Sequence, residues 1–266
     1  MSNTVLWAFC AAVCTWALTA FGAAVVVFFK SPRQSVLNLM LGFSSGVMIA
    51  ASFWSLLQPA IERAEQTLKT PSYIIVTAGF IIGAVFIWLS DKIVSYVLSN
   101  VNSYDFKSYN KTNRVIMLIM SITLHNIPEG LAVGVAFGLL KENYDLSAVM
   151  GAISIAIGIG LQNFPEGAAV SLPLRREGVS RKKSFFYGQL SAVVEPVAAV
   201  LGAALVSTVE TILPFALAFA AGAMIIVAVH ELIPECQKNK SEQPYTATMG
   251  IISGFAVMML LDVMLG

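Results

Sequence analysis

The sequence predicts an all-α integral membrane protein that crosses a bilayer eight times. Of its 266 residues, 57% are hydrophobic and only 12% are charged, whereas soluble domains are about one quarter charged. About 20 consecutive apolar residues cross a bilayer core. Eight such stretches follow one another along the chain: 4–29, 36–59, 73–99, 114–140, 146–172, 184–208, 211–235 and 245–265.

The breaks between these stretches carry charge, proline or polar clusters. The weakest break lies around Glu210 to Pro214, where a tight helical hairpin is favoured over one helix of about 50 residues. The first stretch is longer than the apolar region of a signal peptide, roughly 7–15 residues, and no basic side chain precedes it. We therefore expect a retained first span, and residues 1–266 to form a single transmembrane domain because no loop is long enough for another.

The basic residues predict the orientation of the chain. Eight spans make the loops alternate between sides, and one side holds only Arg63, Lys69 and Lys141 of the 16 lysines and arginines. The other side is then cytoplasmic by the positive-inside rule, and both termini are extracytoplasmic.

A motif containing proline and glutamate occurs in two neighbouring spans. Residues His125–Gly130 read HNIPEG, and Gln162–Gly167 read QNFPEG 37 residues later. Positions i and i+4 share a helix face, so His125 projects with Glu129 and Gln162 with Glu166. Both motifs fall near mid-span in antiparallel neighbours, so we expect them to meet at one level of the membrane.

A third carboxylate, Glu195, lies beside Pro196 in span six. Ionised carboxylates in a low-dielectric interior cost several kcal/mol each unless a cation compensates them. Imidazole with carboxylate suits zinc, iron or manganese, whereas an all-oxygen set suits calcium or magnesium. Met48, mid-span in span two, could add a soft ligand or simply fill the core. A lone glutamate could instead be a protonated packing residue, and Gln162 and Asn163 could only hydrogen-bond across helices.

Span seven ends with HELIPE at residues 230–235, near the cytoplasmic face. Position 234 is proline and the chain has two histidines, so a HExxH metalloprotease is disfavoured. His230 and Glu231, with Asp91 at a similar depth, could form an exit site for an ion, or could anchor helix ends at the interface.

These motifs together resemble the ZIP (Zrt/Irt-like) metal transporters, and Gln162, where many members have histidine, is similar to the GufA-like branch. The resemblance implies inverted repeats in a 3+2+3 arrangement, with spans 1–3 related to spans 6–8. It also implies homodimers, and inward movement of zinc, iron, manganese or cadmium as spans 1, 4, 5 and 6 slide against the others. It further implies a binuclear site: one metal position with His125, Glu129, Gln162, Glu166 and additionally Met48, and a second with Asn126, Glu129, Asn163, Glu166 and Glu195.

Two departures from the family pattern concern the site and a loop. Asn163 is neutral where some relatives have aspartate, so the second position is expected to be weaker. The loop before span four lacks a histidine-rich tract and is not expected to sense metal.

The sequence thus predicts a zinc transporter of the cell membrane rather than an enzyme, with divalent metal as substrate and no organic cofactor. Its expected partners are metal ions, the lipid bilayer and a second copy of the chain. Nucleic acid is excluded by a net charge of +1. Cys10, Cys14 and Cys236 form neither a disulfide framework nor a CxxC pair. The alternatives are a metal-selective channel using the same ligands, an intramembrane metallo-hydrolase, and a structural membrane protein.

Overall fold

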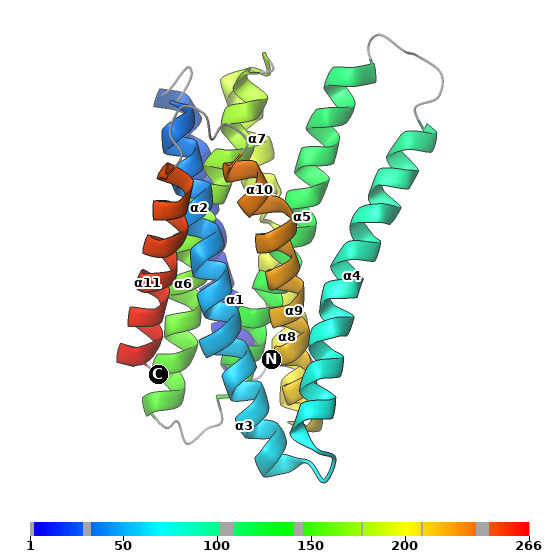
Figure 1. The fold of residues 1–266 in the computed structure, drawn as a ribbon, viewed down its shortest axis with the longest axis vertical. Coiled ribbons are helices and arrows are strands. Elements are labelled where there is room, and N and C mark those ends of the chain that lie inside the picture. The colour runs from blue at the N-terminus through cyan, green and yellow to red at the C-terminus, as the bar shows by residue number, and fades with distance from the viewer. Residues whose placement is uncertain are drawn as a thin grey trace.

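The computed structural model describes residues 3–28, 33–101, 109–140, 146–176, 178–208, 210–237 and 245–265, and these ranges are helical almost throughout, with no strand among them (Figure 1). The elements are α1 (Asn3–Phe28), α2 (Gln34–Ala51), η1 (Ser52–Leu57), α3 (Gln58–Thr67), α4 (Ser72–Val101), α5 (Tyr109–Gly138), α6 (Leu146–Arg176), α7 (Arg181–Leu190), α8 (Val194–Thr208), η2 (Glu210–Ile212), α9 (Leu213–Val227), η3 (Ala228–Leu232), α10 (Ile233–Cys236) and α11 (Thr246–Leu265).

Seven helical segments of the described chain are long and apolar enough to cross a membrane. They are Asn3–Phe28, Gln34–Thr67, Ser72–Ile93, Leu146–Arg175, Arg181–Val206, Leu213–Cys236 and Thr246–Leu265. Each corresponds to one of the predicted spans. The remaining predicted span, 114–140, falls on α5, a 30-residue helix that contains the polar HNIPEG motif.

The boundaries of two predicted spans differ from the sequence expectation. Span two was expected to end at residue 59, but helix continues through α3 to Thr67. Span six is split by a turn at residues 191–193 into α7 and α8. Pro196 explains this turn, because a proline ring clashes with the carbonyl four residues earlier and lacks the N–H that would bond it.

The weak break near residue 210 separates two helices, as the sequence predicted. Helix α8 ends at Thr208, the 3₁₀ turn η2 follows, and α9 begins at Leu213 with Pro214 in its first turn. Helix α8 packs mainly against α5, and α9 mainly against α4. The two helices of this hairpin therefore pack in different parts of the bundle.

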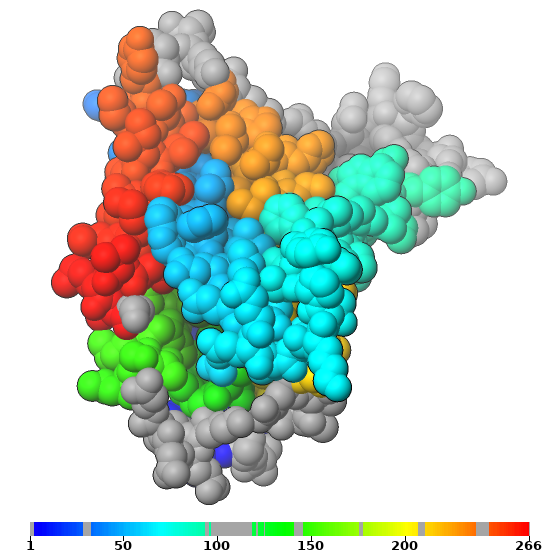
Figure 2. Space-filling view, turned by 60° about the horizontal axis from the view of Figure 1, so that its bottom comes forward, coloured from blue at the N-terminus to red at the C-terminus, as the bar shows by residue number. Residues whose placement is uncertain are grey.

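Four helix pairs dominate the packing: α1 with α6, α5 with α8, α2 with α11, and α4 with α9. In a 3+2+3 repeat, spans 1, 2 and 3 correspond to spans 6, 7 and 8, and span 4 corresponds to span 5. Replacing both helices of one pair by their counterparts then gives another of the four pairs. This pattern is the one that a 3+2+3 repeat would produce. Figure 2 shows α11, the segment from α2 to α3, and α4 lying side by side on one face.

Two π-helical turns occupy corresponding places in the second and seventh spans. In η1 the N–H of Gln58 donates to the carbonyl of Phe53, and in η3 the N–H of Ile233 donates to the carbonyl of Ala228. Proline follows directly in both cases, at positions 59 and 234. A wider turn before proline relieves the clash of its ring with the preceding turn, and such turns recur at functional sites.

The outer surface of the bundle is apolar. Large side chains with more than half of their surface exposed lie on α1, α4, α8 and α11, among them Phe21, Ile93, Leu201 and Val263. A soluble protein rarely exposes so many large apolar side chains, whereas lipid accommodates them. The chain is a multi-pass membrane protein.

Close backbone contact holds the four helix pairs together. At one or more glycines in every pair, an added Cβ would collide with backbone atoms of the partner helix: Gly42, Gly46, Gly250 and Gly254 between α2 and α11, Gly79, Gly83 and Gly222 between α4 and α9, Gly22 and Gly167 between α1 and α6, and Gly130, Gly134 and Gly138 between α5 and α8. Lipid supplies no hydrophobic force between helices, so association depends on such tight packing.

Gly254→Ala should therefore destabilise the protein, because its Cβ would meet the Phe43 carbonyl of α2. We expect a loss of about 1–3 kcal/mol, typical of overpacking, measured as a lower unfolding temperature in detergent. Gly151→Ala is the matched control, since a Cβ there meets nothing within 4 Å. Equal unfolding temperatures for the two variants would contradict this account of the α2–α11 contact.

Candidate metal centre

The two copies of the proline-containing motif touch in the interior of the bundle. Helices α5 and α6 pack together, and Gln162 Nε2 donates to Glu129 Oε1 at 2.6 Å. Both side chains are fully buried. The structure thus brings together two of the predicted ligands from different spans, through the cross-helix hydrogen bond that the sequence left open as an alternative role for Gln162.

The third carboxylate is held by a second amide and by a threonine. Asn163 Nδ2 lies 2.9 Å from each oxygen of Glu195, and Thr15 Oγ1 of α1 donates to Glu195 Oε2 at 2.6 Å. The Thr15 carbonyl also accepts from Asn163 Nδ2 at 3.3 Å. Glu195 belongs to the first turn of α8, where the helix dipole favours a negative charge.

The remaining carboxylate, Glu166, is bonded from α2. Ser44 Oγ donates to Glu166 Oε1 at 2.7 Å. Asn126 of α5 uses its amide nitrogen on two carbonyls, those of Ile122 at 2.9 Å and Ser191 at 3.2 Å. Hydroxyls and amides from four helices, α1, α2, α5 and α6, therefore lie around the three glutamates.

Four buried oxygens of this cluster have no hydrogen-bond donor within the described part of the chain: Asn126 Oδ1, Glu129 Oε2, Gln162 Oε1 and Asn163 Oδ1. Buried polar atoms are rarely left without a partner. Carboxylate and amide oxygens are ligands for divalent cations. The groups of this cluster that lack a partner among the described residues are acceptors. A bound cation would interact favourably with these oxygens.

Every partner named here for the three carboxylates is neutral. A buried carboxylate with neutral partners must take up a cation or a proton to avoid a large desolvation cost. In this conformation no three His, Cys, Asp or Glu side chains come close enough together to hold a metal ion among the described residues. A metal site formed by the described residues must therefore use amide oxygens as ligands, or the carboxylates must move closer together.

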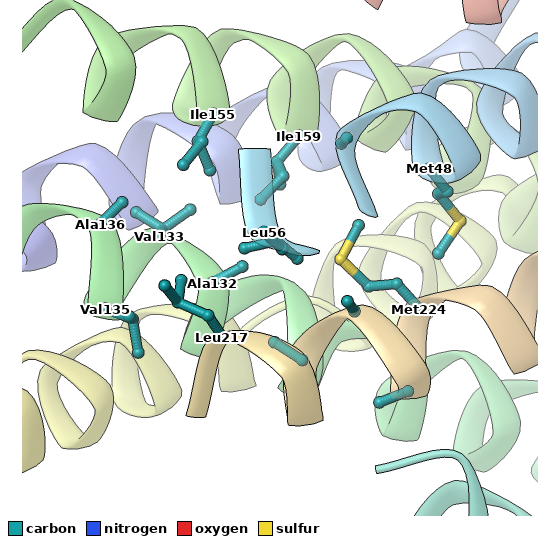
Figure 3. Close-up of a cluster of buried hydrophobic side chains, with 14 of the residues drawn as sticks. Met48, Leu56, Ala132, Val133, Val135, Ala136, Ile155, Ile159, Leu217 and Met224 are labelled. Carbon is teal, nitrogen blue, oxygen red and sulfur yellow. The ribbon is translucent and has the colours of Figure 1, made fainter. Parts of the chain in front are cut away.

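Two further predicted ligands are His125 and Met48. The side chain of His125 lies outside the described residues. Met48 is fully buried and packs in an apolar cluster with Met224, Leu56 and Ile159 (Figure 3). Among its described contacts, Met48 therefore has the environment of a core side chain.

The predicted exit residues lie on two elements. Asp91 is half-buried on α4, and on η3 His230 is exposed and Glu231 half-buried. His230 lines a cavity of about 370 Å³ between α4 and α9, together with Phe80 and Gly222. No hydrogen bond or ion pair joins Asp91 to His230 in the described structure, so the exit site stays a prediction.

Sequence reasoning missed Thr15 and Ser44. Both are small hydroxyl residues inside apolar stretches, and such residues usually bond their own helix backbone. One signal was present for Ser44, since it lies one helical turn before Met48 and so shares the face that the sequence assigned to the site. Thr15 gave no comparable signal.

Comparison with known proteins settles the family. A model of the ZIP zinc transporter family matches residues 4–114 and 103–262. The chain belongs to the ZIP zinc transporter family. Zinc transporter ZIP11 of Xenopus tropicalis is 39% identical over 99% of this chain and 98% of its own length, and human ZIP11 is 36% identical over 95% of each. Zinc transporter GufA of Myxococcus xanthus is 33% identical over 93% of this chain and 94% of its own length. This ZIP protein lies in the GufA-like branch.

Replacing Asn163 by aspartate should change how this ZIP protein responds to metal. A carboxylate there would face Glu195 in place of the amide donor, so we expect Asn163→Asp to lower metal-free stability by about 1–3 kcal/mol. Cadmium should then raise its unfolding temperature more than it does for the wild type, because the ion offsets the added charge.

Asn163→Ala serves as the control, since it removes the donor without adding charge. It should also lose stability but show no larger response to cadmium. A similar response from all three proteins would mean that position 163 does not face the metal.

Proposed function

We propose that this chain moves divalent transition-metal ions, zinc foremost, across a membrane toward the cytoplasm. The ions would pass through the buried centre formed by α5, α6 and α8. The observation that carries the proposal is the burial of three glutamates together with four neighbouring oxygens that lack a donor among the described residues. A passing cation would supply the missing charge.

The chemistry of the centre favours zinc and its neighbours. His125, with the carboxylates, would give a mixed nitrogen and oxygen ligand set, which suits zinc, iron, manganese and cadmium better than calcium or magnesium. The relatives named above are called zinc transporters, which supports zinc as the main substrate. No organic cofactor is needed for this function, and the chain would act as a transporter rather than an enzyme.

Two metal positions would share Glu129 and Glu166. The first would use His125, Glu129, Gln162 and Glu166, with Met48 available only if α2 moves. The second would add Asn126, Asn163 and Glu195. Glu195 accepts hydrogen bonds at both oxygens, so a metal in the second position would compete with Asn163 and Thr15.

The topology fits a carrier with eight spans. Figure 1 shows both chain ends at the same end of the bundle, as an even number of crossings requires, so α5 would be the eighth span. The bias of lysine and arginine would place both ends outside the cell membrane. A homodimer in that membrane, and an exit by way of Asp91, His230 and Glu231, complete the proposal.

The main helix contacts divide the bundle in the way that alternating access would use. Helix α1 contacts α5, α6 and α8, and α5 contacts α6 and α8. Helix α2 pairs mainly with α11 and α4 mainly with α9, and α2 also contacts α6 across the two groups. The first group carries the three glutamates. Movement of that group past the other would expose the centre to each side in turn. A metal-selective channel through the same residues is the alternative.

Glu166→Ala should abolish zinc uptake into proteoliposomes, because this carboxylate would serve both metal positions. Cadmium affinity, measured by calorimetry on the purified variant, should fall at least 100-fold, beyond the loss of about 10–100-fold that is typical when a residue that only orients a ligand is changed. Glu62→Ala is a suitable control, since Glu62 is exposed on α3 and its partner is Gln58. Near wild-type uptake by a well-folded Glu166→Ala protein would remove the centre from consideration.

Metal binding should release protons. Carboxylate and imidazole ligands must be deprotonated to bind metal, so apparent cadmium affinity should fall as the pH drops from about 7 to about 5, around the reference pKa of histidine. Calorimetry in buffers of different ionisation enthalpy counts the protons released. Zero release over that range would mean ligands that are already ionised in a wet cavity, which favours the channel alternative.

A further inference from the structure

One side-chain hydrogen bond ties α2 to the carboxylates of the centre. Ser44 Oγ donates to Glu166 Oε1 at 2.7 Å, and both side chains are buried, with 0% and 4% of their surface exposed. Helix α2 packs mainly against α11, whereas α6 packs mainly against α1. The bond therefore crosses from one group of helices to the other.

The adjacent serine of α2 uses its hydroxyl differently. Ser45 is equally buried, but its hydroxyl donates to the Gly42 carbonyl of its own helix at 2.8 Å. Ser52, later in the same span, likewise bonds the Met48 carbonyl at 2.7 Å. These are the local bonds that serines in helices usually make. Ser44 instead directs its proton to a carboxylate of another helix.

We propose that Ser44 is a positioning residue of the metal centre, which orients the Glu166 carboxylate for metal binding. The inference rests on the proposed function, since it takes Glu166 to be a metal ligand. A donor on one carboxylate oxygen restricts the rotation of the group, and so limits the directions that its second oxygen can take. Partners of this kind orient metal ligands and keep them ionised.

This assignment changes which residue connects α2 to the centre. The sequence pointed to the thioether of Met48, which lies one turn further along the same face but packs among apolar side chains. Ser44 supplies a hydroxyl instead, and acts through Glu166. In this conformation α2 then contributes to ligand geometry through Ser44, while Met48 packs in the apolar core.

The test compares Ser44→Ala with Ser45→Ala. Each removes one buried hydroxyl from adjacent positions of α2, but only the first removes the bond to Glu166. Cadmium affinity by calorimetry should fall about 10–100-fold in Ser44→Ala, with a matching rise in the KM for zinc uptake, and stay near the wild-type value in Ser45→Ala. Metal-free unfolding temperatures of the two variants should be similar. Ser44→Thr, which keeps the hydroxyl, should recover most of the affinity.

The outcomes separate this inference from the proposed function. Equal cadmium affinities for Ser44→Ala and Ser45→Ala would overturn the positioning role, and so would an Ser44→Ala defect that appears only as a lower metal-free unfolding temperature. Glu166→Ala, measured in parallel, reports on the centre itself. Loss of binding in Glu166→Ala with no change in Ser44→Ala would leave the metal centre standing and reject only the role of Ser44.

Discussion

The burial of three carboxylates in the middle of an apolar bundle is the constraint on which the rest of this structure depends. Glu129, Glu166 and Glu195 lie at 0–4% exposure on three helices, where water cannot solvate them. Each receives a hydrogen bond from a different neutral group: Gln162, Ser44, and Asn163 with Thr15. These donors lower the cost of burial without cancelling the charge. The interior is thereby left suited to a cation, which is the property that a metal carrier requires.

The helices can hold these groups in register because their backbones approach closely. Gly130 and Gly134 bring α5 against α8, and Gly167 brings α6 against α1. Larger residues would separate the helices, and the short side chains of Asn163 and Thr15 could then no longer reach Glu195. The polar centre thus depends on the small residues at the helix contacts, because lipid provides no hydrophobic force that would bring the helices together.

The amides do more than fill space between the carboxylates. Gln162 and Asn163 each use their NH₂ group on a glutamate and leave their carbonyl oxygen without a donor among the described residues. An amide can therefore bond a carboxylate when metal is absent and offer an oxygen when metal is present. At position 163 the amide donates to Glu195, which a carboxylate in the same place would repel.

The sequence by itself determined the class of the protein, the places of its helices and the carboxylates at its centre. Apolar stretches of membrane length have few alternative structures, because lipid forces the backbone to bond within each segment. The repeated motif places Glu129 and Glu166 inside two such segments, so the sequence alone indicates a polar centre. Tertiary structure decided the partners. Whether Met48 or Ser44 faces Glu166, and whether Thr15 reaches Glu195, depends on the rotation and separation of α1 and α2 relative to α6 and α8. Those rotations are set by glycine contacts between residues far apart in the chain, such as Gly46 against Ile251, and no local pattern encodes them.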